Sequence, residues 1–257
     1  MLRTILFAGI LLTGFSFLPI NDPDFESGLV AYFSFDDCLA TDDLGLNQGY
    51  LRGRPNCGCG ASEAAIYLDG IDDHIEIKGP VHEAFNGTYT LSFYFKTHAR
   101  SIKQILLSKR EACDFEGESV IEVRHLQPCG NKTTGRVWSE ASPKGKRSVG
   151  VAVMEESTWR MVTIVREGTQ QLIYINGQLI DTREFNHEVT DLTNPAALLL
   201  GYGPCVDDSI EEERNRYFPL IGAIDEFRVY DRPLSAEAIQ ALYDRAPVDL
   251  AEIGCSS

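Results

Sequence analysis

The sequence predicts an all-β protein, an antiparallel two-sheet sandwich with one short C-terminal helix. Three observations support this prediction. Apolar and polar residues alternate with a period of two along most of the chain, turn residues recur at short intervals, and no long segment has the period of a helix. A chain of 257 residues is long enough for one large β domain, which we expect to span residues 28–245.

The first strands are predicted from alternation. Residues 28–35 read GLVAYFSF, and this pattern places Leu29, Ala31, Phe33 and Phe35 on one face. Residues 65–77 read AIYLDGIDDHIEI, which is two strand-like runs around an acidic turn. Residues 88–96 read TYTLSFYFK, where aromatic and aliphatic side chains alternate with Thr, Ser and Lys. Further strands are expected at 105–108, 120–124, 148–153 and 160–166.

A hairpin is predicted around Asn176 and Gly177, which alone separate QLIYI from QLIDTREF. A type I′ turn needs positive φ at both central residues, and Asn-Gly meets that need best. Residues 197–201 and 219–230 are expected to complete the strands. A short helix follows, because Ser235 can cap its N-terminus and Ile239 and Leu242 would share the face toward the sheets.

The two ends of the chain are expected to lie outside the domain. Residues 1–16 combine Arg3, an apolar run and small residues, which is typical of a secretory signal peptide. We therefore expect an extracellular or periplasmic protein, with residues 246–257 as a loose tail. No other segment is apolar enough to span a membrane. A formal net charge of −15 argues against binding to nucleic acid.

Seven cysteines in an exported chain predict a disulfide framework. Cys113 and Cys129 flank a predicted strand and are expected to pair. Cys57 and Cys59 are too close to bond each other, so each needs a distant partner such as Cys38 or Cys205. Cys255 is expected to be unpaired. A zinc site formed by Cys38, Cys57 and Cys59 is an alternative, although their spacing matches no zinc ribbon.

The order of six segments carries a resemblance to a known family. These segments are GLVAYFSFDD, AIYLDGIDDHIEI, YTLSFYFK, WRMVTIVREG, LIYINGQLI and LIGAIDEFRVYDRPLS. Together they resemble the laminin-G-like, concanavalin A-like jelly-roll family. The resemblance implies a two-sheet jelly roll in a mostly extracellular family whose members bind sugars, proteins or calcium. Some relatives on this scaffold are glycoside hydrolases, and the fold alone does not choose among these functions.

The expected function is a secreted, non-catalytic recognition module for carbohydrate, with adhesion or an extracellular protein partner as an alternative. A glycoside hydrolase is the alternative from another class. The laminarinase-type hydrolases on this scaffold carry Glu, Asp and Glu at i, i+2 and i+5, and no acidic cluster of this chain has that spacing.

The expected ligand residues lie in a basic loop between Lys132 and Arg147. They are Trp138, Arg136, Lys144 and Arg147. The alternative for this segment is a solvated loop in which Trp138 closes the edge of the core.

The resemblance also implies a structural calcium ion near Asp225. In LIGAIDEFRVY, strict alternation puts Asp225 on one face with Ala223 and Phe227, where an unpaired carboxylate is costly. The expected calcium ligands are Asp225 with Asp42, Asp43 and Asn47. Alternatively, Asp225 bonds to backbone amides or to an arginine without metal. The turn at Asp72 and Asp73 is interpreted as solvated or capping, with Gly70 supplying the bend.

Overall fold

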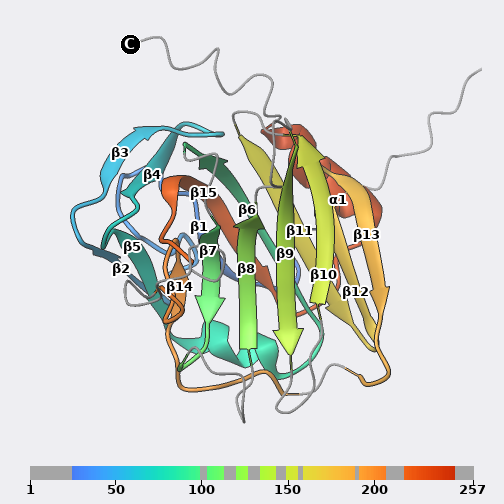
Figure 1. Ribbon diagram of the computed structural model, residues 1–257. Coiled ribbons are helices and arrows are strands. Elements are labelled where there is room, and N and C mark those ends of the chain that lie inside the picture. The colour runs from blue at the N-terminus through green and yellow to red at the C-terminus, as the bar shows by residue number, and fades with distance from the viewer. Residues whose placement is uncertain are drawn as a thin grey trace, which may run out of the picture.

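The chain folds into two antiparallel β-sheets packed face to face (Figure 1). The computed structural model describes residues 25–246 apart from 99–102, 113–119, 127–133, 143–148, 156–158, 189–190 and 207–216. Within these residues no helix is both long and apolar enough to cross a membrane. The predicted all-β sandwich with one short C-terminal helix is confirmed.

The eight-stranded sheet has the order β13-β12-β11-β6-β15-β4-β3, with β1 paired to β15 beside this path. Its strands are β1 (Leu29–Phe33), β3 (Asn56–Cys59), β4 (Ala64–Asp69), β6 (Tyr89–Thr97), β11 (Arg160–Glu167), β12 (Gln170–Ile175), β13 (Gln178–Glu184) and β15 (Ile221–Tyr230). The last strand of the chain, β15, therefore lies inside this sheet and pairs with strands from the first hundred residues.

The seven-stranded sheet has the order β10-β9-β8-β7-β14-β5-β2. Its strands are β2 (Gln48–Arg52), β5 (His74–Lys78), β7 (Gln104–Lys109), β8 (Val120–Leu126), β9 (Thr134–Ser142), β10 (Val149–Glu155) and β14 (Leu198–Leu200). Residues 132–147, interpreted as a loop from the sequence, thus contain the whole of a nine-residue strand, β9. That interpretation was wrong because a strand with one polar face has many polar residues.

The main core lies between the two sheets. Alternation in β6 sends Leu91, Phe93 and Phe95 inward, as predicted, and their rings and aliphatic groups are at most 1% exposed. Phe227 packs between Phe33 and Phe93, with ring centroids 6.3 and 6.2 Å apart. Burial of such large apolar side chains supplies most of the stabilisation of a sandwich of this kind.

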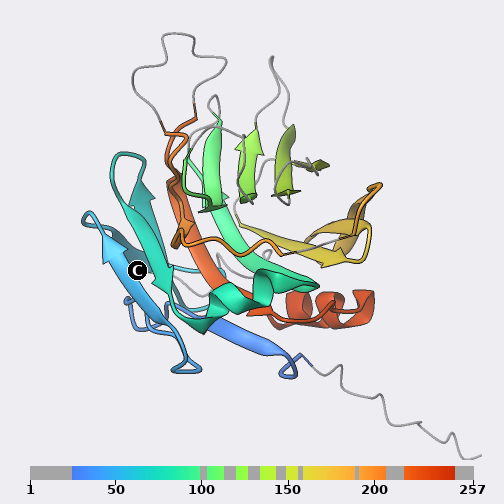
Figure 2. The same cartoon turned by 90° about the horizontal axis from the view of Figure 1, so that it is seen from below.

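A second apolar cluster covers the outer face of the eight-stranded sheet. Helix α1 (Ala236–Arg245) lies on this face, on the side of the sheet away from β8–β10 (Figure 2). Its N-cap forms as predicted, because the Ser235 hydroxyl accepts a hydrogen bond from the Ala238 amide at 3.2 Å. Ile239 and Leu242 are buried against the sheet. A short 3₁₀ helix, η1 (Pro80–Asn86), connects β5 to β6.

The Asn176-Gly177 hairpin is confirmed. Ile175 of β12 pairs with Gln178 of β13, and the two turn residues have φ angles of 50° and 78°. The Asn176 side chain also accepts a hydrogen bond from the Met161 amide at 2.9 Å. This contact fixes the turn against the neighbouring strand β11.

Candidate functional site

The predicted metal site centres on a junction in the eight-stranded sheet, where β15 changes partner. Residues 221–224 of β15 pair with β4, and residues 227–230 pair with β1. Asp225 and Glu226 lie between these two pairings. Opposite β6, the register shifts between Asp225 and Arg228, and Glu226 has a φ of 54°. This is a β-bulge that adds one residue to β15.

The bulge corrects the face predicted for Asp225. Ala223 belongs to the cluster on the outer face, whereas Phe227 and Val229 belong to the core between the sheets. Strict alternation had placed all of them on one face with Asp225. One extra residue reverses the parity of every residue that follows it.

Asp225 is completely buried and is held by backbone amides. Its Oδ2 accepts hydrogen bonds from the amides of Ala61 at 2.7 Å and Ser62 at 3.0 Å. Gly60 makes this approach possible, because a Cβ there would lie 2.5 Å from Oδ2. The other oxygen, Oδ1, makes no hydrogen bond with any described residue. Burial raises the pKa of Asp225 to about 8, and the amides of Ser62 and Ala61 oppose this rise.

The other predicted calcium ligands lie in the loop between β1 and β2, where backbone amides of the loop, β1 and η1 bind them. The Asp42 carboxylate accepts hydrogen bonds from the amides of Tyr32, Leu44, Leu46 and Asn47 and from the Asn47 side chain. The Asn47 Oδ1 accepts one from the Val81 amide at 2.8 Å. Asp43 accepts one from the Ser34 amide at 2.8 Å.

The carboxylates of Asp225, Asp42 and Asp43 are therefore not brought together. Among the described residues, the group with three carboxylate or other ligand atoms within 4.8 Å of one another is Asp69, Asp72 and Asp73. That turn also has a simple hydrogen-bonding explanation: Asp73 accepts from the amides of Arg54 and Asp69, and Asp69 accepts from that of Ile71. Asp225, Asp42 and Asp43 do not form such a group among the described residues, and calcium binding by the four expected residues stays a prediction.

The sequence did not predict that Tyr32, Glu226 and Arg228 form a polar group next to Asp225. Glu226 accepts a hydrogen bond from the Tyr32 hydroxyl at 3.0 Å and forms a salt bridge with Arg228. The Arg228 guanidinium lies 4.0 Å from the centre of the Tyr32 ring. Burial raises the pKa of Asp36, which also lies near Glu226. The only sequence signal for this group was the acidic pair in IDEF, which does not show its partners.

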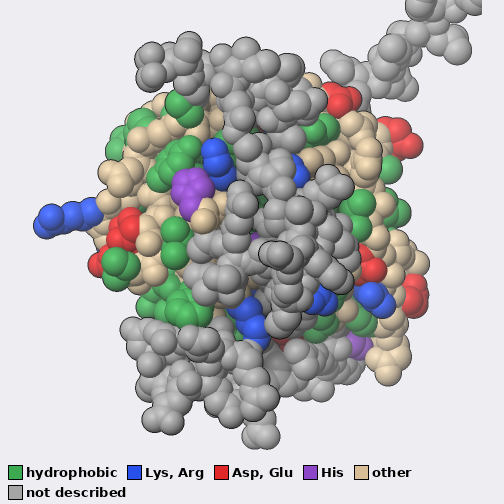
Figure 3. All heavy atoms as spheres, turned by 45° about the horizontal axis from the view of Figure 1, so that its top comes forward, with side chains coloured by type: hydrophobic (Ala, Val, Ile, Leu, Met, Phe, Trp, Pro, Cys, Tyr) green, Lys and Arg blue, Asp and Glu red, His purple; other side chains and the backbone are tan. Residues whose placement is uncertain are grey.

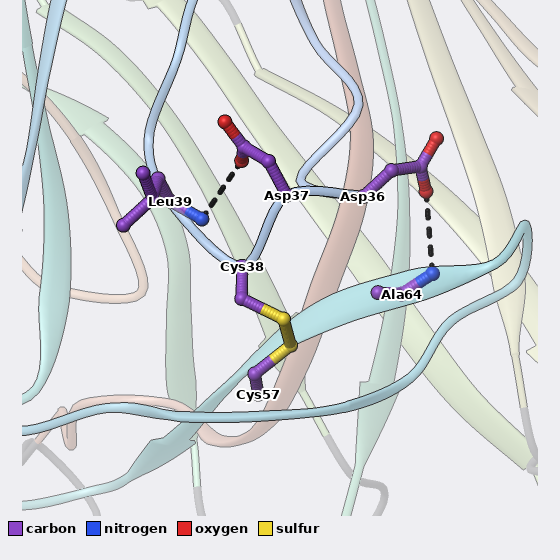
Figure 4. The surroundings of a disulfide bond; sticks show 6 residues. All are labelled: Asp36, Asp37, Cys38, Leu39, Cys57 and Ala64. Carbon is purple, nitrogen blue, oxygen red and sulfur yellow. Dashed lines mark hydrogen bonds between the residues drawn. A yellow bond between two sulfur atoms is a disulfide. The ribbon is translucent and has the colours of Figure 1, made fainter.

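A disulfide bond lies beside the junction (Figure 4). Cys38 bonds to Cys57, which confirms the expectation that Cys57 needs a distant partner. The Asp36 carboxylate accepts from the Ala64 amide at 3.2 Å, so the same loop is also held to β4. The zinc alternative fails because the sulfur atoms of all three of its cysteines, Cys38, Cys57 and Cys59, are in disulfide bonds.

The other cysteines are described only in part. Cys59 and Cys205 are also disulfide-bonded. Cys113, Cys129 and Cys255 lie outside the described residues, so the predicted Cys113–Cys129 bond stays a prediction.

Four of the five non-glycine residues with positive φ in the described part of the chain lie around the junction. They are Phe35, Cys38, Glu63 and Glu226, and the fifth is Asn176 of the hairpin. Positive φ costs non-glycine residues about 1 kcal/mol or more each, so the surrounding contacts must hold these conformations in place.

A second candidate site lies on the outer face of the seven-stranded sheet. One row of paired residues crosses it in the order Tyr50, Glu76, Leu199, Ser108, Glu122 and Glu140. Acidic and basic side chains both reach the surface in the view of Figure 3, and they lie close together at its left edge. The row has an accessible end at β2 and β5 and a buried part at β8 and β9.

The accessible end of the row is an aromatic residue surrounded by ion pairs, which we call the Tyr50 platform (Tyr50, Arg52, Glu76 and Lys78). Tyr50 is 38% exposed. Arg52 and Lys78 lie 4.9 and 5.8 Å from the centre of its ring. Glu76 receives hydrogen bonds from Arg52 Nε at 2.7 Å and pairs with Lys78 at 2.6 Å. The Lys78 ammonium, together with Arg52, holds the pKa of Glu76 below its usual value.

A stacked pair of rings extends the platform. His74 of β5 pairs with Arg52 of β2, and its ring lies 5.0 Å from that of Tyr202 at an interplanar angle of 25°. Both rings are partly exposed. The outer face therefore has partly exposed aromatic rings next to charged hydrogen-bonding groups.

The buried part of the row is a charged cluster around Glu122. Glu122 is fully buried and forms salt bridges with Arg110, at 2.9 Å, and Arg124. Tyr217 lies against Arg124, with 4.0 Å between the guanidinium and the ring centre. Glu140 pairs directly with Glu122 across the two strands, and both side chains are at most 3% exposed.

The residues predicted to bind a ligand belong to the same sheet where they are described. Arg136 is exposed on β9, and the backbone of Trp138 pairs with Arg124 and Val151. Lys132, Lys144, Lys146 and Arg147 lie outside the described residues. Their role stays a prediction.

Solved structures with the same fold include two kinds of binding domain. Domain 4 of AbnA, a GH43 extracellular arabinanase from Geobacillus stearothermophilus, was solved in complex with arabinotriose. It is 19% identical, with a TM-score of 0.59, and the match covers 84% of this chain and 98% of that one. The binding domain of Paraclostridial Mosquitocidal Protein 1 is 16% identical with a TM-score of 0.62. That of botulinum neurotoxin DC, in complex with SialylT, is 12% identical with a TM-score of 0.59.

Each of these two matches covers 85% of this chain but only 52% of the other protein's chain. At such identities the likeness shows the fold alone. No curated protein sequence matches the chain.

The family is shown by a match of residues 69–240 to the model Laminin_G_3, described as the concanavalin A-like lectin/glucanases superfamily. This match covers more than half of the chain and includes β6 and β15, the two strands between which the register shifts. It agrees with the two-sheet architecture and with the segments that carried the resemblance. The chain therefore belongs to the concanavalin A-like lectin/glucanase superfamily.

Proposed function

We propose that this protein is a secreted, non-catalytic carbohydrate-binding module that binds sugars on the outer face of its seven-stranded sheet. The observation that carries the proposal is the Tyr50 platform, where a partly exposed ring lies among a carboxylate, a guanidinium and an ammonium group. The proposal is further supported by the arabinotriose complex of the structurally similar GH43 domain.

The chemistry of the platform suits a sugar ring. One face of a pyranose or furanose ring is rich in C–H groups, which pack on an aromatic ring, while its hydroxyl groups both donate and accept hydrogen bonds. Glu76 would accept from a hydroxyl group, and Arg52 would donate to its neighbour. Because the two are already ion-paired, they are held in place before a ligand arrives, which lowers the entropic cost of binding.

The platform favours a neutral sugar over an acidic one. Arg52 and Lys78 carry two positive charges, but both contact Glu76, and the protein as a whole carries a formal charge of −15. Long-range repulsion would therefore oppose the approach of a polyanionic glycan. An uncharged oligosaccharide does not meet this barrier.

The test is a glycan array followed by titration of the best ligand into wild type and Tyr50→Ala. We expect Tyr50→Ala to weaken binding at least tenfold, which corresponds to about 1.4 kcal/mol. The matched control is Leu179→Ala, because Leu179 is 51% exposed on β13 of the other sheet. Retained affinity in Tyr50→Ala, or an equal loss in the control, would contradict this site. An array with no bound glycan would instead favour an extracellular protein partner.

One observation favours the alternative of a glycoside hydrolase. Glu122 and Glu140 are directly opposite each other on β8 and β9, so their side chains extend from the same face of the sheet. Retaining glycosidases use two carboxyl groups about 5–5.5 Å apart. Sugar release from a polysaccharide that disappears in Glu140→Gln would establish this alternative and displace the binding module.

Secretion and a structural calcium ion are parts of the same proposal. Secretion is supported by the disulfide bonds, which form in oxidising compartments. Calcium is supported by Asp225 alone among the four expected ligands, because its buried Oδ1 has no hydrogen-bond partner among the described residues. A cation would supply the missing positive charge at the junction.

A further inference from the structure

The inner face of the eight-stranded sheet changes from apolar to polar at one end. Three successive rows of paired residues cross β6, β11 and β12. They are Phe93–Val162–Ile175, Leu91–Ile164–Ile173 and Tyr89–Arg166–Gln171. The first two rows are entirely apolar and belong to the core between the sheets. The third row contains a guanidinium and an amide, and its three side chains are 0% exposed.

Arg166 has more donors than partners. Its Nη1 donates a hydrogen bond to the Gln170 carbonyl at 3.1 Å. Its Nε and Nη2 have no acceptor among the described residues. The Phe185 ring lies 4.9 Å from the guanidinium carbon and covers one side of it. Two buried nitrogen atoms of the guanidinium thus donate no hydrogen bond to a described residue, which is costly in a folded protein.

The neighbouring Tyr89 is in the same situation. Tyr89 is the direct cross-strand neighbour of Arg166, and its buried hydroxyl has no partner among the described residues. Burial raises the pKa of Tyr89, and Arg166 opposes that rise. The phenol therefore stays neutral and is a donor rather than a counter-charge.

No carboxylate in the described part of the chain balances the charge of Arg166. Burial lowers the pKa of Arg166, and among the described residues the ionisable group that opposes this effect is Tyr89. Arginine nevertheless remains protonated in proteins. A buried positive charge without a counter-charge is strongly unfavourable, so this end of the core needs a negative charge near Arg166.

We propose that a small inorganic anion, chloride in a saline medium, binds between the sheets beside Arg166 and Tyr89. The anion accepts hydrogen bonds from Arg166 Nε and Nη2 and from the Tyr89 hydroxyl, and it supplies the missing negative charge. A water molecule can accept these hydrogen bonds but brings no charge. The inference is independent of the sugar-binding proposal, which concerns the outer face of the other sheet.

The surroundings favour a small anion. Gln171 reaches across to the opposite sheet, where its amide nitrogen donates to the Ser139 carbonyl at 3.4 Å. Gly150 leaves room for this side chain, because a Cβ at that position would lie 2.5 Å from the Gln171 nitrogen. The row is therefore closed on the side of Gln171 by packing between the sheets, which disfavours larger oxyanions.

The direct test is a crystal structure from crystals grown in sodium bromide, because bromide replaces chloride and scatters anomalously. We expect an anomalous peak within hydrogen-bond reach of Arg166 and the Tyr89 hydroxyl. A water molecule at that position, or no density, would overturn the proposal.

A second test measures thermal unfolding in chloride and in gluconate at equal ionic strength. We expect the wild-type midpoint to be higher in chloride, and Tyr89→Phe to need at least tenfold more chloride for the same rise. Tyr89→Phe should fold normally in gluconate, since it removes a hydroxyl group that has no partner. The control Arg183→Gln, on the exposed edge strand β13, should respond as wild type does. Equal midpoints in the two salts would refute the site.

Discussion

Two buried carboxylates in this protein are handled in opposite ways. Glu122, on the seven-stranded sheet, is flanked by Arg110 and Arg124, so its charge is matched by protein groups. Asp225, at the junction of the other sheet, accepts two backbone amides and has no cationic partner among the described residues. Both are 0% exposed. Burial alone therefore does not decide how the protein accommodates a carboxylate. The neighbouring cations and hydrogen-bond donors also decide it.

The largest effect is expected where a matched pair is broken. Glu122→Leu leaves two buried arginines without their carboxylate, and loss of one partner of a buried ion pair costs about 3–5 kcal/mol. Urea denaturation should show this decrease in the free energy of unfolding. A loss below 1 kcal/mol would mean that other groups already balance these arginines, and the contrast with Asp225 would disappear.

A smaller effect is expected from pH at the unmatched carboxylate. The folded state raises the pKa of Asp225 to about 8, so between the unfolded value near 4 and pH 8 the folded state binds more protons. Its contribution to stability is therefore lost as pH rises through this window, by at most about 1.4 kcal/mol per pH unit. Urea denaturation with a chelator present, at pH 6 and at pH 7.5, measures this loss. Over this range the free energy of unfolding of wild type should fall by at most about 2 kcal/mol more than that of Asp225→Asn. Parallel pH profiles for the two proteins would show that Asp225 is already ionised.

Calcium binding provides another test of how the charge of Asp225 is balanced. If a cation supplies the charge that Asp225 lacks, calcium should raise the unfolding midpoint of wild type and leave that of Asp225→Asn unchanged. At a calcium concentration 100 times the dissociation constant the gain would be about 2.7 kcal/mol at most. Asp42→Asn is the informative companion, because the Asp42 carboxylate is already used by hydrogen bonds from its own loop. A calcium response that depends on Asp42 as well as Asp225 would restore the site of mixed ligands expected from the sequence.

The smallest effect is expected at Tyr32. Tyr32→Phe removes the hydrogen bond to Glu226 but leaves the Glu226–Arg228 salt bridge and the ring beneath Arg228 in place. The free energy of unfolding should fall by about 0.5–1.5 kcal/mol. A larger decrease in thermal or urea denaturation would indicate that Tyr32 also positions the bulge.

The sequence predicted the strands where alternation is uninterrupted and failed where the backbone breaks the period. In β6 the inward residues follow directly from the pattern. In β15 the same rule failed after Asp225, because Glu226 forms a bulge without the glycine that usually marks one. The sequence thus contained the right residues for the junction but no sign of the register shift.

The candidate sites were predictable only in part because their partners come from distant segments. Asp42 and Asn47 were interpreted as cation ligands, but Asn47 is held by groups from β1 and η1 that no local pattern reveals. The Tyr50 platform was not predicted, because it forms only when β2 and β5 pair. By contrast, the Cys38–Cys57 bond could be anticipated, since the spacing of Cys57 and Cys59 forbids a bond between them.

The position of β15 has a consequence for how the chain folds. The final strand supplies the pairing surface for β6 on one side and for β4 and β1 on the other. Until residues 221–230 emerge during synthesis, these earlier strands have no partner along those edges, and contacts such as Leu29 with Tyr230 close a loop of nearly the whole domain. High contact order of this kind slows folding. The eight-stranded sheet can therefore close only after residues 221–230 have been synthesised, so its earlier strands wait for the last one before they are fully paired.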